Sequence, residues 1–431
     1  MRNKIIAGLD IGTNTIKCLV IERGEAGWTI LSCSQIPSFG LRRGAVVNVE
    51  DTAKNIQLLI SRVERDCGRK INSVFVNIGG SHLYVTPSDG LISVSRADHV
   101  ISQEDIERVL QATRAINIPL NEEILDVFPK EFIIDDQKGI KQPLGLAGVR
   151  LEAKVVLLCY FQSYFINLTQ AVLNAKLQID DIIPSPLAAA RAVLTPEQKE
   201  IGVALVDIGS ATTSLAVFEE GDLIHLAILP LGSDNITKDI AIGLRTEVAV
   251  AEYIKRQYGS CIFTKSDLSG QSGKEKINKE KKKIELPEKL SAISGEEQLK
   301  IEKSYHLSFT KKNLSDIIGP RVYEILDLMQ KELKKIGRQE LLPGGIVLTG
   351  GGVKLSKMRD LVKQQLKLPC RIGIPKDIAG MPEDPALATV AGLVLIGADF
   401  ENLEPKGLMG LSGAIKRFSS KFKRIFRVFI P

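Results

Sequence analysis

The chain has 431 residues, of which 44% are hydrophobic and 25% charged, and its 57 Lys and Arg against 51 Asp and Glu give a net charge of +6. This length exceeds one ordinary hydrophobic core and predicts two to four packed subdomains, while the composition excludes disordered and collagen-like proteins. Residues 406–431 hold seven of the basic residues and no acid, so residues 1–405 carry a net charge of −1. The excess charge belongs to the C-terminal tail, which argues against a broadly basic nucleic-acid-binding protein.

The cysteines and the apolar segments indicate a cellular compartment. Six cysteines stand singly, without a CxxC pair or metal-ligand spacing, and only four histidines accompany them. These residues predict reduced thiols and no zinc site. The N-terminus lacks the apolar region of a signal peptide, and no run of 18 apolar residues is present. We therefore expect a cytosolic protein that reaches a membrane only through its surface.

Two strand–turn–strand segments repeat one another at an offset of 197 residues. The first reads IIAGLDIGTNTIKCLVIERG, and the second, from residue 203, reads VALVDIGSATTSLAVFEEG. The offset aligns seven identical residues within fifteen positions, beginning with Asp10 and Asp207. Unrelated D-x-G turns between strands are the alternative explanation, but the second strands also match. The pattern therefore predicts an internal duplication.

The segment between the two copies has a pattern of its own. Ser102 and Asp105 form a capping-box signal, and apolar residues follow at helical spacing at Ile106, Val109, Leu110 and Ile116. Extended segments are expected at 124–134 and 149–160, which predicts an inserted helix-plus-sheet unit over 82–161. Downstream, residues 265–312 contain twelve Lys and eight acids, and they predict a mobile, solvated loop.

The two D-x-G turns predict paired loops that face each other across a cleft. Glycine lets the backbone N–H groups approach phosphate oxygens, and Asp10 and Asp207 would hold Mg²⁺ through water. Short polar donors accompany both loops, namely Thr13, Asn14, Thr15, Ser210 and Thr212. A third turn, Gly350-Gly351-Gly352, lies between a buried strand at 346–349 and a helical pattern. This turn is either structural or a place where a flat ring or a phosphate meets bare backbone, and its order after the two D-x-G hairpins favours a nucleotide site.

The C-terminal tail predicts an amphipathic helix. Its apolar residues fall on one helical face: Leu411, Ile415, Phe418, Phe422, Ile425, Phe426 and Phe429. Six basic residues and no acid occupy the remaining surface: Lys416, Arg417, Lys421, Lys423, Arg424 and Arg427. Aromatic rings suit the acyl boundary and basic groups suit anionic lipid headgroups, so we expect this helix to lie on a membrane. Docking on the protein's own core is the alternative.

The chain resembles the superfamily of actin, sugar kinases and heat-shock chaperone ATPases. The superfamily's two phosphate motifs and its adenosine motif match LDIGTNTIK, LVDIGSATTS and VLTGGGVKL. Within it, the insert ISQEDIERVLQATRA…EILDVFPKEFIIDDQKGIKQPLGLAGVRLEA is similar to the characteristic subdomain of the bacterial actin-like cell-division family FtsA. The runs ITKDIAIGLRTEVAVAEYIKRQYG and NLSDIIGPRVYEIL also resemble that family, so the similarity covers nearly the whole chain except the Lys-rich loop.

The resemblance implies an α/β fold of two actin-like lobes, built on duplicated ribonuclease-H-like domains around an ATP cleft. Lobe 1 would comprise residues 1–81, 162–195 and 370–400, with the insert at 82–161. Lobe 2 would comprise 196–231 and 314–369, with an outer subdomain at 232–313 that contains the Lys-rich loop. Residues 401–431 would be a linker and a membrane-targeting helix.

The resemblance also implies a nucleotide site. Carried over onto this chain, it comprises Asp10, Gly12, Thr13 and Asn14 in the first loop, Asp207, Gly209, Ser210 and Thr212 in the second, Gly232 at the next strand–helix turn, Glu252 and Lys255 near the nucleoside, and Gly350, Gly351 and Gly352 at the adenosine turn. An exposed helix ion pair is the alternative for Glu252 and Lys255.

The second loop departs from the family pattern. It reads D-I-G-S-A-T-T-S where the family commonly has D-I-G-G-G-T-T-D, so Ser210 and Ala211 replace glycines and Ser214 replaces an acid. The first loop, T-N-T-I-K, is closer to the related pilus-assembly protein PilM. Less backbone freedom and one carboxylate fewer predict that ATP and Mg²⁺ bind but that any ATPase activity is weak.

These features favour a cell-division scaffold that polymerises on the cytoplasmic face of the inner membrane at the division site. Its implied partners are the C-terminal tail of the tubulin-like protein FtsZ, further copies of itself, anionic lipid and later division proteins, but no nucleic acid. A PilM-like scaffold of pilus or secretion machinery is favoured by the first loop and opposed by the insert. A small-molecule kinase would need a carboxylate base beside the acceptor hydroxyl, for which we find no motif.

Overall fold

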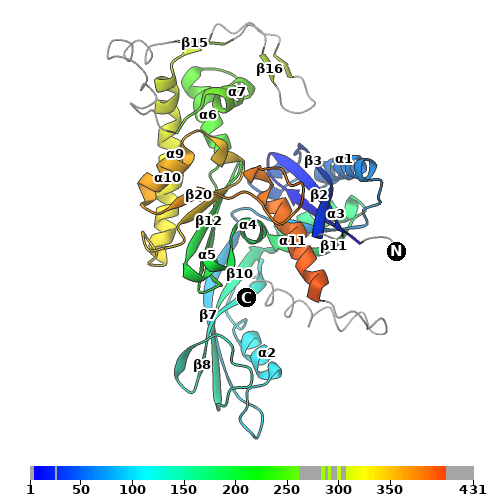
Figure 1. The fold of residues 1–431 in the computed structure, drawn as a ribbon, viewed down its shortest axis with the longest axis vertical. Coiled ribbons are helices and arrows are strands. Elements are labelled where there is room, and N and C mark those ends of the chain that lie inside the picture. Colours follow the sequence, from blue (N-terminus) through cyan, green and yellow to red (C-terminus); the bar gives the residue numbers. More distant parts are fainter. Residues whose placement is uncertain are drawn as a thin grey trace.

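The computed structural model describes residues 4–24, 27–261, 283–286, 290–292, 299–301 and 307–403. They form two lobes and an insert that extends away from both (Figure 1). The predicted tail helix lies outside the described residues, as does most of the predicted Lys-rich loop. Within the described ranges, every helix is too short or too polar to span a bilayer.

Lobe 1 is built on a five-stranded sheet in the order β11-β6-β1-β2-β3. Its strands are β1 (Ile5–Ile11), β2 (Thr15–Gly24), β3 (Gly27–Pro37), β6 (Ser73–Ile78) and β11 (Gln178–Pro184). β2 pairs antiparallel with both β1 and β3, whereas β6 pairs parallel with both β1 and β11. Two helix pairs pack on this sheet, α1 (Val49–Cys67) with α3 (Gln162–Asn174) and α4 (Ser185–Val193) with α11 (Ala388–Leu403). The central strands are therefore nearly continuous apolar runs.

Lobe 2 repeats this topology. Its sheet has the order β14-β13-β12-β19-β20, with β12 (Val203–Ile208), β13 (Thr213–Glu219), β14 (Asp222–Leu229), β19 (Ile346–Thr349) and β20 (Cys370–Ile372). Even the turns correspond, because Gly12 N donates to Thr15 O at 3.2 Å and Gly209 N donates to Thr212 O at 2.9 Å. The same bond at the same offset of 197 residues confirms the predicted duplication.

The remaining elements complete the two lobes. Lobe 2 carries α6 (Ser233–Leu244), α7 (Val248–Tyr258), α9 (Lys311–Lys335) and α10 (Met358–Leu366). Short elements connect the larger ones: β4 (Leu41–Arg42), β5 (Ala45–Val46), α5 (Pro196–Ile201), β15 (Ile284–Glu285), β16 (Leu290–Ala292), β17 (Leu299–Ile301), β18 (Ser308–Phe309), η2 (Gly351–Lys354) and η3 (Pro385–Leu387).

The insert is a four-stranded antiparallel sheet in the order β7-β10-β8-β9, with one helix against it. Its elements are β7 (Leu83–Ser93), α2 (Gln103–Ala112), β8 (Glu122–Ile134), β9 (Gln137–Ile140) and β10 (Arg150–Phe161). Ser102 caps α2 as predicted, and apolar side chains of α2 and the sheet form a separate core. The helix ends at Ala112, so Ile116 packs on that core from the following segment rather than from the helix.

Asp105 fixes the start of α2. Its carboxylate is fully buried and accepts hydrogen bonds from the hydroxyl of Ser102 at 2.6 Å and the hydroxyl of Ser95 at 3.0 Å. The backbone N–H groups of the same two serines also donate to it. Burial alone would raise the pKa of Asp105, but these bonds outweigh it and lower the pKa to about 2.

We predict that Asp105→Ala lowers the free energy of opening of α2, measured by amide hydrogen exchange at pH 7, by about 2–4 kcal/mol, because it removes the carboxylate half of the capping box and leaves buried donors unpaired. A carboxyl whose pKa is lowered by folding stabilises the fold at pH values above its ordinary pKa. The difference in opening free energy between wild type and variant should therefore disappear as the pH falls from about 4 to about 2. Asp98→Ala removes an ion pair with Arg96 on the surface and is the control. Equal exchange in both variants would contradict the prediction.

Candidate functional site

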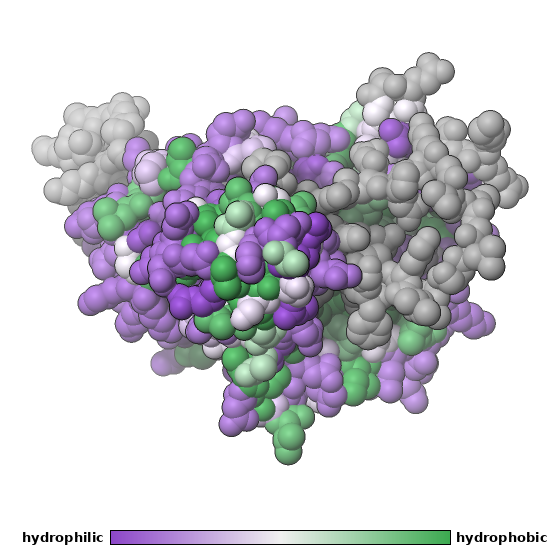
Figure 2. Space-filling view, turned by 90° about the horizontal axis from the view of Figure 1, so that it is seen from below, coloured by the Kyte–Doolittle hydropathy of each residue, from purple (hydrophilic) through white to green (hydrophobic). Residues whose placement is uncertain are grey.

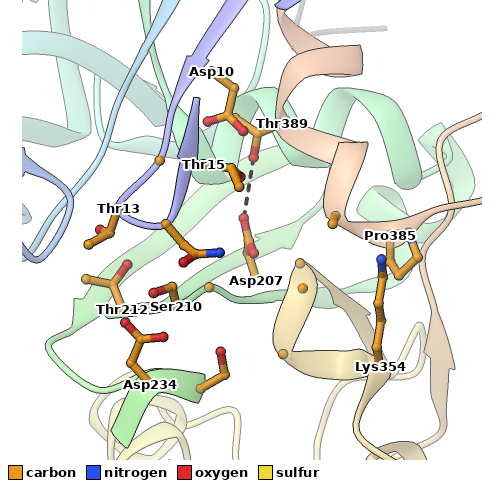
Figure 3. A pocket seen from close by; sticks show the side chains of 18 of the residues that line it. Asp10, Thr13, Thr15, Asp207, Ser210, Thr212, Asp234, Lys354, Pro385 and Thr389 are labelled. Atoms are coloured by element: carbon orange, nitrogen blue, oxygen red, sulfur yellow. Dashed lines mark hydrogen bonds between the residues drawn. The ribbon is translucent and has the colours of Figure 1, made fainter. Parts of the chain in front are cut away.

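A cavity of about 620 Å³ lies between the two lobes. Its walls come from the first loop, the second loop, the glycine turn and α7. Figure 3 shows Asp10, Asp207 and Ser210 among the side chains that line it. All but one of the residues predicted for the nucleotide site line it: Asp10, Gly12, Thr13, Asn14, Asp207, Gly209, Ser210, Thr212, Glu252, Lys255, Gly350, Gly351 and Gly352. Tertiary structure thus brings together residues that are more than 300 positions apart in the sequence.

Asp10 is held by two partners at the end of β1. Lys17 Nζ lies 3.0 Å from Asp10 Oδ2, and Asn77 Nδ2 donates to Asp10 Oδ1 at 2.9 Å. The same amide of Asn77 accepts a 2.6 Å hydrogen bond from Ile11 N, which fixes its orientation. Burial lowers the pKa of Lys17, but Asp10 and the field of Asp207 outweigh it and raise the pKa above its ordinary value. The cavity therefore contains a fixed ammonium group beside two carboxylates.

Asp207 occupies the equivalent position at the end of β12. Thr389 from α11 donates to Asp207 Oδ2 at 3.4 Å, the bond drawn as a dashed line in Figure 3. Burial raises the pKa of Asp207, the charge of Asp10 raises it further, and Lys17 and Thr389 offset only part of this, so the pKa is about 6. A cation that arrives between the two loops would lower this pKa and relieve the repulsion.

The glycine turn fits closely under the second loop. Gly350 has a φ of +89°, and a Cβ at this position would lie 2.2 Å from Asp207 Oδ1. A Cβ at Gly352 would lie 2.5 Å from Ile208 Cγ2. Neither position can accept a side chain without displacing the second loop. Bare backbone therefore faces the cavity here, as a bound ring or phosphate requires.

Gly232 is the predicted residue that lies behind the cavity wall. It caps α6, and a Cβ there would lie 2.4 Å from Ser210 O. The next two residues, Ser233 and Asp234, donate backbone hydrogen bonds to Gly209 O and Ser210 O, and both line the cavity. The start of α6 thus supports the second loop from behind.

Glu252 and Lys255 form an ion pair, with Lys255 Nζ 2.6 Å from Glu252 Oε2. The pair is not exposed, in contrast to the alternative considered for these two residues. Lys255 is buried, and its Nζ also donates to Thr237 Oγ1 at 2.7 Å. Burial raises the pKa of Glu252, but Lys255 and Thr237 outweigh it and lower the pKa below its ordinary value. The pair is therefore a charged part of the cavity wall.

The cavity has the chemistry of an anion site. The hydroxyl of Ser210 is buried without a hydrogen-bond partner among the described residues, and it belongs to the loop around the cavity. An unpaired buried hydroxyl is costly unless a ligand accepts from it. Within the described residues, no three His, Cys, Asp or Glu side chains are grouped to hold a metal ion, so Asp10 and Asp207 are two carboxylates and not a complete cage. This donor set fits a phosphate that brings its own hydrated Mg²⁺.

Sequence reasoning missed many polar residues of the cavity, among them Lys17, Asn77, Lys354, Asp384 and Thr389. Lys17 had a signal, because alternation along β2 puts it on the same face as Thr15. Asn77 had one too, as a polar residue at the end of an apolar strand before two glycines. Lys354 pairs with Asp384 at 2.6 Å, a contact that only the folded chain forms.

We predict that Asp207→Asn stabilises the protein without ligand at pH 7 by about 1–2 kcal/mol, less than the full pKa shift would give because the carboxyl lines a cavity open to water. A carboxyl with a raised pKa is destabilising above that pKa, so the gain should be present at pH 7 and should largely vanish near pH 4. Chemical denaturation at the two pH values measures it. A gain that is equal at both would show that charge burial is not its cause.

The comparisons with known proteins agree with this geometry. The model of the family described as cell division protein FtsA matches residues 204–392, and the model of the SHS2 domain inserted in FtsA matches residues 80–159. The chain is 35% identical over 398 residues to cell division protein FtsA of Pseudomonas aeruginosa, an alignment that covers 91% of this chain and 89% of that protein. It is 33% identical over 392 residues to FtsA of Bacillus subtilis, covering 91% and 83%.

Solved structures show the same fold at low sequence identity. The PilM–PilN type IV pilus biogenesis complex has a TM-score of 0.62 at 20% identity, covering 93% of this chain and 99% of the other. MreB5 of Spiroplasma citri bound to ADP has a TM-score of 0.52 at 12% identity, covering 94% and 99%. Together with the inserted domain, these likenesses confirm the predicted actin-like α/β fold. The sequence relatives go further than the fold, and the chain belongs to the FtsA family of bacterial cell division proteins.

Proposed function

We propose that this FtsA-family chain binds ATP between its lobes, polymerises on the inner membrane at the division site and tethers FtsZ filaments there, recruiting later division proteins. The observation that carries the nucleotide part is the pair of equivalent loops, one from each lobe, that face a single cavity with a bare glycine turn beside them. An actin-like structure of similar fold was solved with ADP and another with AMPPNP. Family membership supports the division role.

Each wall of the cavity would contact a different part of the nucleotide. The backbone N–H groups of the first and second loops and the Ser210 hydroxyl would bind the phosphates, and Lys17 would add a positive charge. Asp10 and Asp207 would hold the water shell of the Mg²⁺ ion, which supplies charge neutralisation for the phosphates. Glu252, Lys255 and the turn at 350–352 would contact the nucleoside. The chain's four-subdomain division given above is part of the same proposal.

The same walls favour slow hydrolysis. Three carboxylates of the cavity already have cationic partners: Asp10 pairs with Lys17, Glu252 with Lys255 and Asp384 with Lys354. Orienting a water for attack on the terminal phosphate needs a group whose hydrogen-bonding capacity is free. The side chain of Ser214, which replaces an acid of the family pattern, lies in the cavity wall opposite Asp207 in the sheet register. We therefore propose ATP as a ligand that fixes the lobes.

We predict that the purified protein binds ATP with Mg²⁺ but releases phosphate very slowly, and that Asp207→Ala weakens binding about ten-fold or more because the ion loses one carboxylate. Isothermal titration calorimetry measures the binding, and a phosphate-release assay measures turnover. Asp98→Ala, on the surface of the insert, is the matched control. Rapid phosphate release that disappears in Asp207→Ala would refute the slow-turnover part of the proposal.

The membrane part depends on the tail, which lies outside the described residues. Its seven apolar residues at helical spacing and its charged residues, all of which are basic, support an interfacial helix. It follows α11, the last described element, through a linker that contains Pro405 and Gly407. Anionic lipid is the partner that its charge favours.

We predict that deleting residues 408–431 abolishes co-sedimentation with phosphatidylglycerol-containing vesicles and leaves the melting temperature unchanged. Changing Lys421, Lys423 and Arg424 to Gln should weaken binding about 100-fold, because each basic residue near an anionic surface contributes about 1 kcal/mol. Changing Lys334, Lys335 and Arg338 to Gln removes as many charges from lobe 2 and is the control. Undiminished sedimentation of the truncated chain would refute the tether.

The division role needs its own experiment. A fluorescent peptide with the sequence of the FtsZ C-terminal tail should sediment with these vesicles only when the full chain is present, and more strongly with ATP.

The insert offers one further surface for protein partners, since its exposed apolar residues gather at the end of the molecule that faces the viewer in Figure 2. They are Leu91, Leu120, Leu144, Leu146 and Val149.

Neither alternative function has equal support. The likeness to the PilM–PilN complex concerns the fold, whereas the sequence relatives and the inserted domain are those of FtsA. A small-molecule kinase would need a free carboxylate beside an acceptor hydroxyl. Three carboxylates of the cavity are paired with lysines, and the other two, Asp207 and Asp234, belong to the second loop and the start of α6, where the phosphates would lie.

A further inference from the structure

The insert contacts lobe 2 as well as lobe 1. Strand β14, the edge strand of the lobe 2 sheet, packs against β7, β8 and β10 of the insert. Apolar side chains of the two parts belong to one hydrophobic cluster: Phe128, Val156 and Leu158 from the insert, and Leu223, Leu226 and Ile228 from β14. The insert therefore covers an edge that would otherwise expose unpaired backbone groups.

Beyond this apolar contact, one lysine of the insert binds two acids of lobe 2. Lys141 Nζ lies 2.6 Å from Asp222 Oδ2 and 3.0 Å from Glu220 Oε2, and it also donates to Lys130 O at 3.0 Å. We name these three charged residues, Lys141, Glu220 and Asp222, the Lys141 clamp. The side chain of Asp222 is only 15% exposed, so the contact is shielded from solvent more than an ordinary surface pair.

The clamp is one strand away from the second loop. Glu220 lies in the turn between β13 and β14 and Asp222 is the first residue of β14, while β13 begins at Thr213, directly after the loop residues Ser210 and Thr212. β13 leads directly from the second loop to this turn, so a shift of the loop along the strand would displace the turn at its other end. Neither Lys141 nor Asp222 lines the cavity.

The other attachment of the insert leads to the first loop. Gly79 and Gly80 line the cavity, and Gly80 O accepts a hydrogen bond from Leu83 N at the start of β7. Two residues before Gly79, at the end of β6, Asn77 binds Asp10. The insert is thus joined to opposite walls of the cavity, covalently on the lobe 1 side and through the apolar contact with β14 and the Lys141 clamp on the lobe 2 side.

We propose that the insert and the cavity are coupled through the Lys141 clamp. A ligand that draws the two phosphate loops together favours the lobe arrangement in which the clamp is closed. By thermodynamic linkage, a closed clamp raises the affinity for that ligand by the same factor. The orientation of the insert therefore reports whether the cavity is filled. This inference rests on the proposed function, because it takes ATP with Mg²⁺ as the ligand.

A double-mutant cycle tests the coupling. Lys141→Met and Asp222→Ala, singly and together, are compared with the wild-type full chain for the Kd of ATP·Mg²⁺ by calorimetry. Each single variant should bind about five-fold more weakly or worse, within the usual range of coupling between sites. The double variant should bind ATP·Mg²⁺ as well as the single variant with the lower affinity does, because both substitutions remove the same contact.

A matched control separates the clamp from a general effect of the insert. Lys154→Met breaks an ion pair in which Lys154 Nζ lies 2.8 Å from Glu131 Oε1. Both residues belong to the insert, so this variant should leave the Kd of ATP·Mg²⁺ unchanged. Hydrogen exchange gives a second readout. ATP should slow amide exchange in the turn at 219–222 and in β9 of the wild type, and this protection should be lost in Lys141→Met.

The outcomes are distinct. If folded clamp variants bind ATP as the wild type does, or if Lys154→Met weakens binding as much, the coupling is overturned while the nucleotide function stands. If the wild type itself shows no binding heat with ATP and Mg²⁺, the proposed nucleotide function fails and the coupling fails with it. Circular dichroism melting identifies any variant that does not fold. If one of the two single variants, Lys141→Met or Asp222→Ala, does not fold, the other one decides the test.

Discussion

Two carboxylates that face each other in a buried cleft set the conditions for the rest of this molecule. Asp10 and Asp207 stand at equivalent positions of a duplicated hairpin, and the lobes bring them to the same cavity. Burial raises the pKa of Asp207, and repulsion from the charge of Asp10 raises it further, to about 6. Lys17 offsets part of it by binding Asp10 directly. A cleft built in this way is poised for a cation and the phosphates that carry it.

The surrounding backbone is adapted to the same requirement. Gly350 and Gly352 lie so close to Asp207 and Ile208 that no side chain fits, and the start of α6 holds the second loop from behind. Residues from four distant segments thus fix two carboxylates and leave the space between them open. Such preorganisation lets a ligand bind without paying for the ordering of each loop. The unpartnered hydroxyl of Ser210 is the exception within this packing, and a phosphate oxygen would satisfy it.

The insert extends this arrangement to the surface. It grows from the strand that ends beside the first loop, and it contacts the hairpin that begins beside the second loop. It has its own hydrophobic core and a capped helix, with the buried carboxylate of Asp105 in the capping box. An inserted unit of this kind can carry a change in the cleft to a distant surface, since it is attached to both lobes.

The sequence by itself determined the duplication, the two loops, the glycine turn, the insert and the family, because each depends on a local pattern of glycines, carboxylates and apolar periodicity. It also gave the start of α2, since a capping box is formed by residues three apart. The partners of those local motifs were decided only by the tertiary structure. Lys17 had a strand-alternation signal, but the pairing of Lys354 with Asp384, the bond from Thr389 to Asp207 and the contact of Lys141 with Asp222 join segments that are 30 to 182 residues apart. No local pattern specifies such contacts, because they arise from how two sheets and an insert pack, and that packing depends on the whole hydrophobic core.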